Sequence, residues 1–367
     1  MASPVVARGV CHVLVAFEIG QSVDLDRSER LAATGARRPW RESRRAPQQF
    51  GNRPAPLSIL QDPAGIPVVA GLEAIAVQIV LYDFGAASLS VLFPLTGPLE
   101  SLPSLSGELY GHPVLLDCAR TRIAALLETI GSAVVRPRLA EAVEDYVIFQ
   151  IDAFEPPLPP PVLVREHGPT IARILRAEQG PVSDDETADA LAARLSAGAS
   201  DLAIVDWNAA LVYDPDPAET CDVLEFANVQ LLEVRFLDEQ LDVALEQAYD
   251  TLTRGAQGIA ILRSYAADLD RIAELEADAA VVFERVTNAL KLVGDQYLSR
   301  LYTLVSGRLH LGDWDASIAR KLQTIGGIYQ KLADRATARR LEVLEWIVIL
   351  LIAIEILLSI LPGFARH

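Results

Sequence analysis

The last apolar run of the chain, "WIVILLIAIEILLSILPGF" from Trp346 to Phe364, restricts the possible folds more than any other segment. As a continuous helix it would measure about 28 Å at ~1.5 Å of rise per residue, close to the ~30 Å hydrocarbon thickness of a bilayer. A helix packed on a protein surface keeps a polar face, and this run carries one charged group, Glu355. The run therefore predicts a single C-terminal transmembrane helix over residues 341–364.

The flanks of this run predict an orientation. Arg335, Arg339 and Arg340 precede it, and positive flanks stay on the cytoplasmic side of a membrane. Trp346 and Phe364 stand at its two ends, where aromatic side chains anchor a span at the lipid interfaces. The sequence thus predicts a tail-anchored, single-pass protein of the cell membrane, with the bulk of the chain in the cytoplasm.

Glu355 is the objection to a membrane span. A carboxylate at the centre of a bilayer costs ~2.5–3.5 kcal/mol on insertion scales, which several leucines and isoleucines can offset. It could be protonated there, or bind a partner helix. The alternative is a C-terminal helix buried in the core of the protein itself, with Glu355 paired to an arginine.

Composition restricts the setting of the rest of the chain. The 367 residues carry a formal net charge of -17, which disfavours non-specific attraction to nucleic acid over the whole surface. Cys11, Cys118 and Cys221 are scattered, as expected in a reducing compartment without a disulfide framework. The N-terminus lacks the pattern of a secretory signal or of an Arg- and Ser-rich presequence.

The first 165 residues predict a mixed α/β domain. The run from Val10 to Gly20 is β-branched and apolar, and Ala74 to Leu95 has the pattern of two strands joined by a hairpin at Asp83-Phe84-Gly85. A helix and another strand follow, before a proline cluster over residues 156–161 that indicates a loop or linker. Residues 166–216 add a helix capped by Asp184 or Asp185 and a strand pair, which complete this domain.

From residue 217 to residue 340 the pattern becomes helical. A first helix from about Ala218 to Leu252 has an apolar stripe made of Leu224, Ala227, Leu231, Val234, Leu241, Ala248 and Leu252. A second from about Ser264 to Val305 has a near-heptad seam, and a third starts near Asp313 and continues into the terminal run. The predicted fold class is therefore α+β, in which the mixed domain is followed by long antiparallel, coiled-coil-like helices and the transmembrane helix. The long helices could pack on one another within one chain, as an intramolecular hairpin, or between copies.

The helical segments resemble the Required-for-Meiotic-Nuclear-Division family, in its bacterial branch. The similarity rests on "RRLEVLEWIVILLIAIEIL", in which the R-L-E-x-x-E-W pattern runs from Arg340 to Trp346 and an apolar stretch containing Glu355 follows. "SDLAIVDWNAALVYD" and "YDFGAASLSVLFPL" give a looser match towards the N-terminus. The resemblance implies membrane attachment through the tail, no established catalytic activity, and a link of the mitochondrial members to translation.

Patterns that would indicate catalysis or metal binding are nearly absent from the sequence. No C-x-x-C or H-x-x-x-H occurs, and no nucleophile, base and orienting group can be assembled into a triad. Asp206-Trp207-Asn208 is the strongest candidate for a pocket. The competing interpretation is a turn that Asp206 and Asn208 close while Trp207 packs inward. We expect no cofactor and identify no small-molecule substrate.

An arginine-rich stretch over residues 27–53 departs from the acidity of the rest. It holds eight arginines against two glutamates, a net charge of +6. A set of cationic and aromatic residues suited to an anionic partner, RNA or lipid, lies within it: Arg37, Arg38, Trp40, Arg41, Arg44 and Arg45. A solvated loop is the alternative.

Together these observations predict a non-enzymatic scaffold or assembly factor, tethered to the bilayer and self-associating into a homo-oligomer through its long helices. The alternatives are an RNA- or ribosome-associated module that uses the arginine-rich stretch, and an enzyme with its site near Asp206-Trp207-Asn208.

Overall fold

The computed structural model describes residues 3–32, 35–37, 55–253 and 296–360, together with positions 273, 275, 277 and 280. The chain forms two compact units. Unit 1 comprises residues 1–236 and 282–315, and unit 2 comprises residues 237–281 and 316–367. The long helix α6 (Ala218–Thr253) and the long helix α9 (Leu311–Ile360) each contribute to both units.

Unit 1 is built on one mixed sheet, whose strands run in the order β10-β11-β12-β9-β1-β6-β5-β4-β3 among the described residues. The central strand β1 pairs antiparallel with β6 on one side and β9 on the other, and β12 pairs parallel with β9. The bounds are β1 Val5–Glu18, β3 Gly35–Arg37, β4 Leu57–Gln61, β5 Ala76–Leu81, β6 Ala86–Pro94, β7 Gly97–Pro98, β9 Val143–Glu155, β10 Arg194–Leu195, β11 Leu202–Val205 and β12 Ala209–Tyr213, with β2 Ser22–Val23 and β8 Val134–Val135 in a separate pair.

The predicted hairpin at Asp83-Phe84-Gly85 is confirmed, because it connects the antiparallel strands β5 and β6. Gly85 has φ = +100°, a conformation that residues with a Cβ rarely adopt. A Cβ built there would lie 1.9 Å from the carbonyl oxygen of Gly20. The turn therefore requires glycine both for its dihedral angle and for the close approach of the chain after β1.

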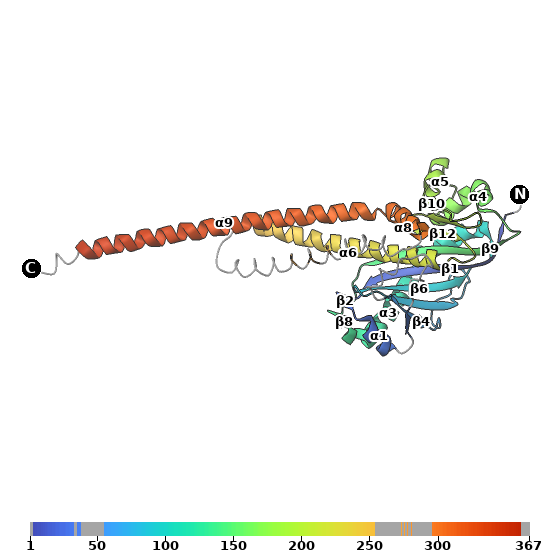
Figure 1. The fold of residues 1–367 in the computed structure, drawn as a ribbon, viewed down its shortest axis with the longest axis horizontal. Helices are drawn as coiled ribbons and strands as arrows, with labels where there is room; N and C mark the ends of the chain where they lie inside the picture. The colour runs from blue at the N-terminus through green and yellow to red at the C-terminus, as the bar shows by residue number, and fades with distance from the viewer. Residues whose placement is uncertain are drawn as a thin grey trace, which may run out of the picture. The chain divides into compact units, whose positions relative to one another are not determined.

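One face of the sheet is covered by helices from the first half of the chain (Figure 1). Because side chains alternate between faces along a strand, Val13, Val15 and Phe17 of β1 all point into this core. The covering elements and their neighbours are α1 Leu25–Ala32, η2 Leu99–Ser101, α2 Leu102–Leu109, α3 Pro113–Ile130, η3 Gly131–Ala133, α4 Pro160–Leu175 and α5 Asp184–Ala190.

The other face of the sheet is covered by α6. Ala16, Val80 and Ala86, which alternate with the residues of the first core, pack against Val229 and Leu232 of this helix. The helix α8 (Gln296–Arg308) packs against β10 and β11, and its Tyr302 ring lies 6.3 Å from that of Phe226. Unit 1 is therefore a three-layer structure with helices on both faces of the sheet.

Two local predictions in unit 1 can be compared with the structure. The loop predicted at the proline cluster is confirmed over residues 156–159, and α4 begins within the cluster at Pro160, where the missing N–H of a first-turn proline costs nothing. The cap of α5 is neither Asp184 nor Asp185 but Ser183, which accepts a hydrogen bond from the backbone N–H of Glu186 at 3.1 Å.

Unit 2 contains a helix pair formed by the end of α6 and the continuation of α9. Lys321 of α9 binds Asp238 and Asp242 of α6 at 2.8 and 2.6 Å, and Ser317 donates a hydrogen bond to Asp238. The contacts advance from Ser317 to Lys321 along α9 as they advance from Asp238 to Asp242 along α6, so these two helices run parallel. This pair does not test the antiparallel arrangement predicted for consecutive long helices, because most of the second helix, predicted over residues 264–305, lies outside the described residues.

The apolar stripe predicted on the first long helix is confirmed. The side chains of Leu224, Ala227, Leu231, Val234, Leu241 and Ala248 are all buried, and that of Leu252 lies outside the described side chains. Within unit 2 the buried positions Leu237, Leu241, Ala244 and Ala248 recur at steps of four and three, which is the spacing of a coiled-coil seam.

The predicted transmembrane helix is wrong. Of the helices that the structure describes, none combines the length and the apolarity that a bilayer crossing requires. Between the exposed carboxylates of Glu345 and Glu355 the helix rises only about 15 Å, half of the ~30 Å hydrocarbon thickness. The membrane and tail-anchor interpretation of Trp346 and Glu355 is withdrawn with it, and both side chains are exposed in α9.

Several predicted site residues fall outside the described part of the chain. These are Arg38, Trp40, Arg41, Arg44 and Arg45 of the arginine-rich stretch and Phe364 of the terminal run. Arg37 is described as the last residue of strand β3, which pairs with β4. Arg335, Arg339 and Arg340 lie on α9, and their side chains are not described.

Candidate functional site

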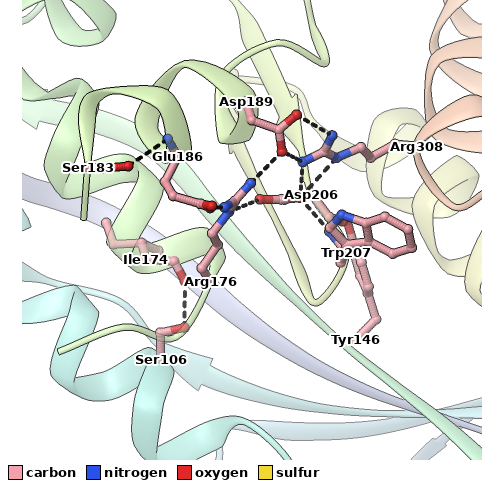
Figure 2. A network of polar contacts seen from close by, with 10 residues as sticks. All are labelled: Ser106, Tyr146, Ile174, Arg176, Ser183, Glu186, Asp189, Asp206, Trp207 and Arg308. Carbon is pink, nitrogen blue, oxygen red and sulfur yellow. Dashed lines mark hydrogen bonds and ion pairs between the residues drawn. The ribbon is translucent and has the colours of Figure 1, made fainter. Parts of the chain in front are cut away.

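A cluster of charged side chains in unit 1 centres on Asp206, in the turn between β11 and β12 (Figure 2). The side chain of Asp206 is fully buried. Its own backbone N–H donates to the carbonyl of Ala209 at 2.9 Å, and its Oδ1 accepts from the backbone N–H of Trp207 at 2.9 Å. The turn is therefore closed as the sequence predicts for Asp206, and its carboxylate points into the protein.

Two arginines from distant parts of the chain neutralise this carboxylate. Arg308, the last residue of α8, donates from Nε and Nη2 to Oδ1 of Asp206 at 2.9 and 2.6 Å. Arg176, at the C-terminal end of α4, donates from Nε to Oδ2 at 3.0 Å. Both guanidinium groups are largely buried, with side-chain exposures of 13% and 19%. A buried carboxylate is tolerated at this position because both of its oxygens accept charge-assisted hydrogen bonds.

Helix α5 supplies further carboxylates to the same two arginines. Asp189 accepts from Arg308 Nη2 at 2.7 Å and from Arg176 Nη2 at 2.5 Å, and Glu186 also pairs with Arg176. The hydrogen bond from Arg308 is the largest influence that lowers the pKa of Asp189, and the bond from Arg176 acts in the same direction. The Asp206 cluster, as we name Arg176, Glu186, Asp189, Asp206 and Arg308, thus joins α4, α5, the β11–β12 turn and α8.

Tyr146 of β9 forms a hydrogen bond with the backbone of the turn. Its hydroxyl donates to the backbone carbonyl of Asp206 at 3.0 Å. Burial, followed by the nearby charge of Asp206, raises the pKa of Tyr146 well above its usual value. The phenol is therefore held neutral as a hydrogen-bond donor, and does not act as a base.

Trp207 does not pack inward, so that part of the turn interpretation is wrong. Its side chain is 47% exposed and stacks on the ring of His310 with 4.9 Å between centroids. The guanidinium carbon of Arg308 lies 5.8 Å from the Trp207 ring, at cation–π distance. Asn208 takes part through its backbone, where its carbonyl accepts from Val147 at 3.1 Å. The three predicted residues therefore share one turn, and only Asp206 enters the buried network.

The chemistry open to Asp206 is limited by its partners. A general base needs a lone pair directed at substrate, and a nucleophile needs access to it. Both oxygens of Asp206 are engaged by arginines or by the backbone, and the group is shielded from solvent. The arrangement therefore fits an ionic bond between elements better than an acid–base site.

Sequence reasoning missed Arg176, Asp189 and Arg308. Arg176 and Arg308 lie 30 and 102 residues from Asp206, and neither belongs to a recognisable motif. Each is an ordinary charged residue at or near a helix end. No local signal could have identified these partners.

A second set of polar contacts, two of them buried, lies between α6 and its neighbours. Ser90 donates to Glu225 at 3.3 Å, and Tyr302 donates to Gln230 at 2.6 Å, with burial raising the pKa of Tyr302 to about 12. Arg235 donates to both oxygens of Glu144 at 2.8 and 2.7 Å. These contacts fix the position of α6 on the sheet.

The cysteines and potential metal ligands indicate no further chemistry. Burial raises the pKa of both Cys11 and Cys221, which keeps these thiols protonated and unreactive. Within the described ranges, no group of three or more His, Cys, Asp or Glu residues is placed to hold a metal ion.

Comparison with known proteins gives one family. The model of the family described as "Uncharacterized protein MJ0711, N-terminal domain" matches residues 8–219, from β1 to the start of α6. "Uncharacterized protein MJ0711" of Methanocaldococcus jannaschii is 25% identical over 221 residues, which are 59% of this chain and 66% of that protein, just under two thirds of its length. No solved structure matches the chain. The resemblance of the C-terminal helices to the Required-for-Meiotic-Nuclear-Division family stays a prediction. The chain belongs to the family of the MJ0711 N-terminal domain, and the matched residues include the sheet and the turn that carries Asp206.

Proposed function

We propose that the chain is a non-enzymatic scaffold that associates with other protein chains through unit 2. The observation that carries this proposal is the exposed apolar surface of α9. Twelve large apolar side chains between Leu341 and Leu357 have exposed fractions of 44–65%. Scattered apolar residues on a surface need no explanation, whereas a contiguous apolar patch of this kind marks an interaction site.

The size of this surface supports a specific interface. About half of each of twelve large side chains amounts to an exposed apolar area on the order of 1,000 Å², compared with ~800 Å² buried by each partner in a standard protein interface. An isolated helix in water gains little from propensity alone, and most helical stability comes from burying an apolar face. The described end of α9 is therefore expected to be stable as a helix when another chain covers it.

The closed state of the polar cluster in unit 1 supports a non-enzymatic role. The carboxylate of Asp206, the strongest candidate from the sequence, is held by Arg176 and Arg308 and shielded from solvent. The enzyme alternative would need a reacting group with a free lone pair at this turn.

The proposal is tested by disrupting the apolar surface. In full-length protein, Ile347→Glu combined with Leu351→Glu places two charges on exposed positions, so the variant is expected to fold normally. Val114→Glu, at an exposed position of α3, is the matched control. Mass photometry of the purified protein and chemical cross-linking in cell extract should both lose higher-mass species in the double variant and keep them in the control.

The result that overturns the scaffold proposal is a wild-type protein that is monomeric when purified and forms no protein cross-links in extract. Complexes that persist unchanged in the double variant would overturn the assignment of the interface to α9.

A further inference from the structure

We propose that the apolar segment of α9 pairs antiparallel with the same segment of a second copy of the chain, with Glu355 of each copy opposite Arg340 of the other. This inference rests on the scaffold function proposed above and specifies its partner. It follows from the pattern of α9 residues between positions 340 and 355.

One face of α9 has the spacing of a coiled-coil seam. Leu344, Ile347 and Leu351 follow one another at steps of three and four residues, and their exposed fractions are 57%, 48% and 59%. Arg340 precedes Leu344 by four residues and Glu355 follows Leu351 by four, so both positions fall on the same face of the helix. The seam thus has a basic position at its start and an acidic one at its end.

The charges on this seam decide the direction of pairing. In a parallel pair in register, Glu355 would lie opposite Glu355 of the second copy, and Arg340 opposite Arg340. In an antiparallel pair centred between Ile347 and Val348, Leu344 lies opposite Leu351 of the second copy and Arg340 opposite Glu355. Opposite charges then meet at both ends of the contact and like charges at neither, which is how such positions select partner and orientation.

The same type of seam already operates within unit 2. Leu237, Leu241 and Ala244 of α6 are buried at steps of four and three, and Ile318 and Ile325 of α9 are buried at a step of seven. Further along α9 the same kind of apolar residue is exposed, from Leu341 to Leu357. A second copy would continue on this part of α9 the helix packing that α6 provides at its start.

Symmetry adds to this argument. An antiparallel contact between identical segments is closed by a two-fold axis, so each copy uses one and the same patch and the assembly stops at a defined size. The exposed apolar residues from Trp346 to Ile352 are consecutive, so they lie on every face of α9, and a second copy packed on the seam covers the face that carries Leu344, Ile347 and Leu351. A second copy therefore satisfies this face and the charge pattern together.

Charge reversal tests the pairing in purified full-length protein. Glu355→Arg and Arg340→Glu should each weaken self-association on the order of tenfold, because each creates two like-charge pairs related by symmetry. The double variant should restore the wild-type dissociation constant, measured by analytical ultracentrifugation. Glu342→Arg, at an exposed position on another face of α9, is the matched control and should leave it unchanged.

Disulfide formation tests the direction independently. In a background with Cys118→Ser, a mixture of Leu344→Cys and Leu351→Cys proteins should form a heterodimeric disulfide, whereas Leu344→Cys alone should not. A disulfide between two Leu344→Cys chains indicates parallel pairing and overturns the inference.

Three other outcomes of these experiments would overturn the proposed pairing. Complexes in extract combined with a monomeric purified protein would overturn the second copy as partner and leave the scaffold function standing. A purified monomer that binds phosphatidylcholine vesicles would overturn the inference as well, and so would self-association that the double charge reversal fails to restore.

Discussion

Replacing the buried carboxylate at the centre of unit 1 should destabilise this unit strongly. Asp206→Ala removes the acceptor for Arg176 and Arg308, whose side chains are only 19% and 13% exposed. Breaking a buried ion pair by removing one partner typically costs ~3–5 kcal/mol, because the other charge stays buried without compensation. Both arginines keep Asp189, so we expect a loss near the lower end, about 3 kcal/mol.

Asp206→Asn separates charge from hydrogen bonding at the same position. The amide keeps one acceptor oxygen for a guanidinium and loses the negative charge, and a hydrogen bond to a charged group contributes ~1.5–3 kcal/mol. We therefore expect a loss of about 2 kcal/mol, between that of Asp206→Ala and the wild type. Asp313→Ala is the control, because it removes a contact of 2.8 Å with His310 from an Asp313 side chain that is 83% exposed, and such exposed pairs contribute less than about 1 kcal/mol.

The assay is urea unfolding followed by circular dichroism, together with hydrogen exchange of the peptide that covers residues 296–310. The urea midpoint should fall in the order control, Asp206→Asn, Asp206→Ala, and exchange in α8 should rise in the same order. If Asp206→Ala shifts the midpoint no more than Asp313→Ala does, the cluster does not hold these elements together and the reasoning fails.

Two further predictions concern unit 1. Gly85→Ala should lower the free energy of unfolding by more than ~2 kcal/mol, since the new Cβ would meet the Gly20 carbonyl at 1.9 Å. Gly65→Ala, at φ = +84° with no described atom within 4 Å of its Cβ, should cost only ~1 kcal/mol of backbone strain. The urea midpoints of the two variants measure this difference, and equal losses would contradict the steric argument. Because Arg308 and Arg176 lower the pKa of Asp189 in the folded protein, its contribution is present above the unfolded pKa of ~3.9 and lost as pH falls below it. The stability difference between pH 6 and pH 3 should thus be smaller in Asp189→Asn than in the wild type, by less than about 1 kcal/mol given the exposure of the group; an unchanged difference would refute it.

Strands and the first long helix could be predicted from the sequence because their signals are local. Alternating apolar residues and Gly85 identify the β5–β6 hairpin, and the period of the stripe identifies α6. More of α6 is buried than its apolar stripe predicts. Asn228 and Gln230 are 1% exposed although they are polar, because α6 has the sheet on one side and α8 on another. A helical period reveals one apolar face, and cannot reveal that a second face is enclosed.

The Asp206 cluster could not be predicted in the same way. The turn residues were identified, yet their role depends on Arg308, which reaches them only after the chain has passed through α6 and returned in α8. The apolar run of α9 shows the opposite failure, because the cost of Glu355 inside a span was taken to be offset by the leucines and isoleucines around it. Local pattern predicts elements, whereas the contacts between elements depend on pairs of residues far apart in sequence.

The position of Arg308 explains why an ion cluster is placed at this point in unit 1. Apolar packing of α8 alone would tolerate small shifts along the helix axis, since neighbouring leucines can exchange places at little cost. A guanidinium that must meet both Asp206 and Asp189 permits one register, because any shift would leave a buried charge unpaired. Two residues later His310, at φ = +54°, ends this helix and stacks on Trp207 before α9 begins at Leu311. The cluster therefore fixes the register of α8 on unit 1 and the turn at which α9 begins.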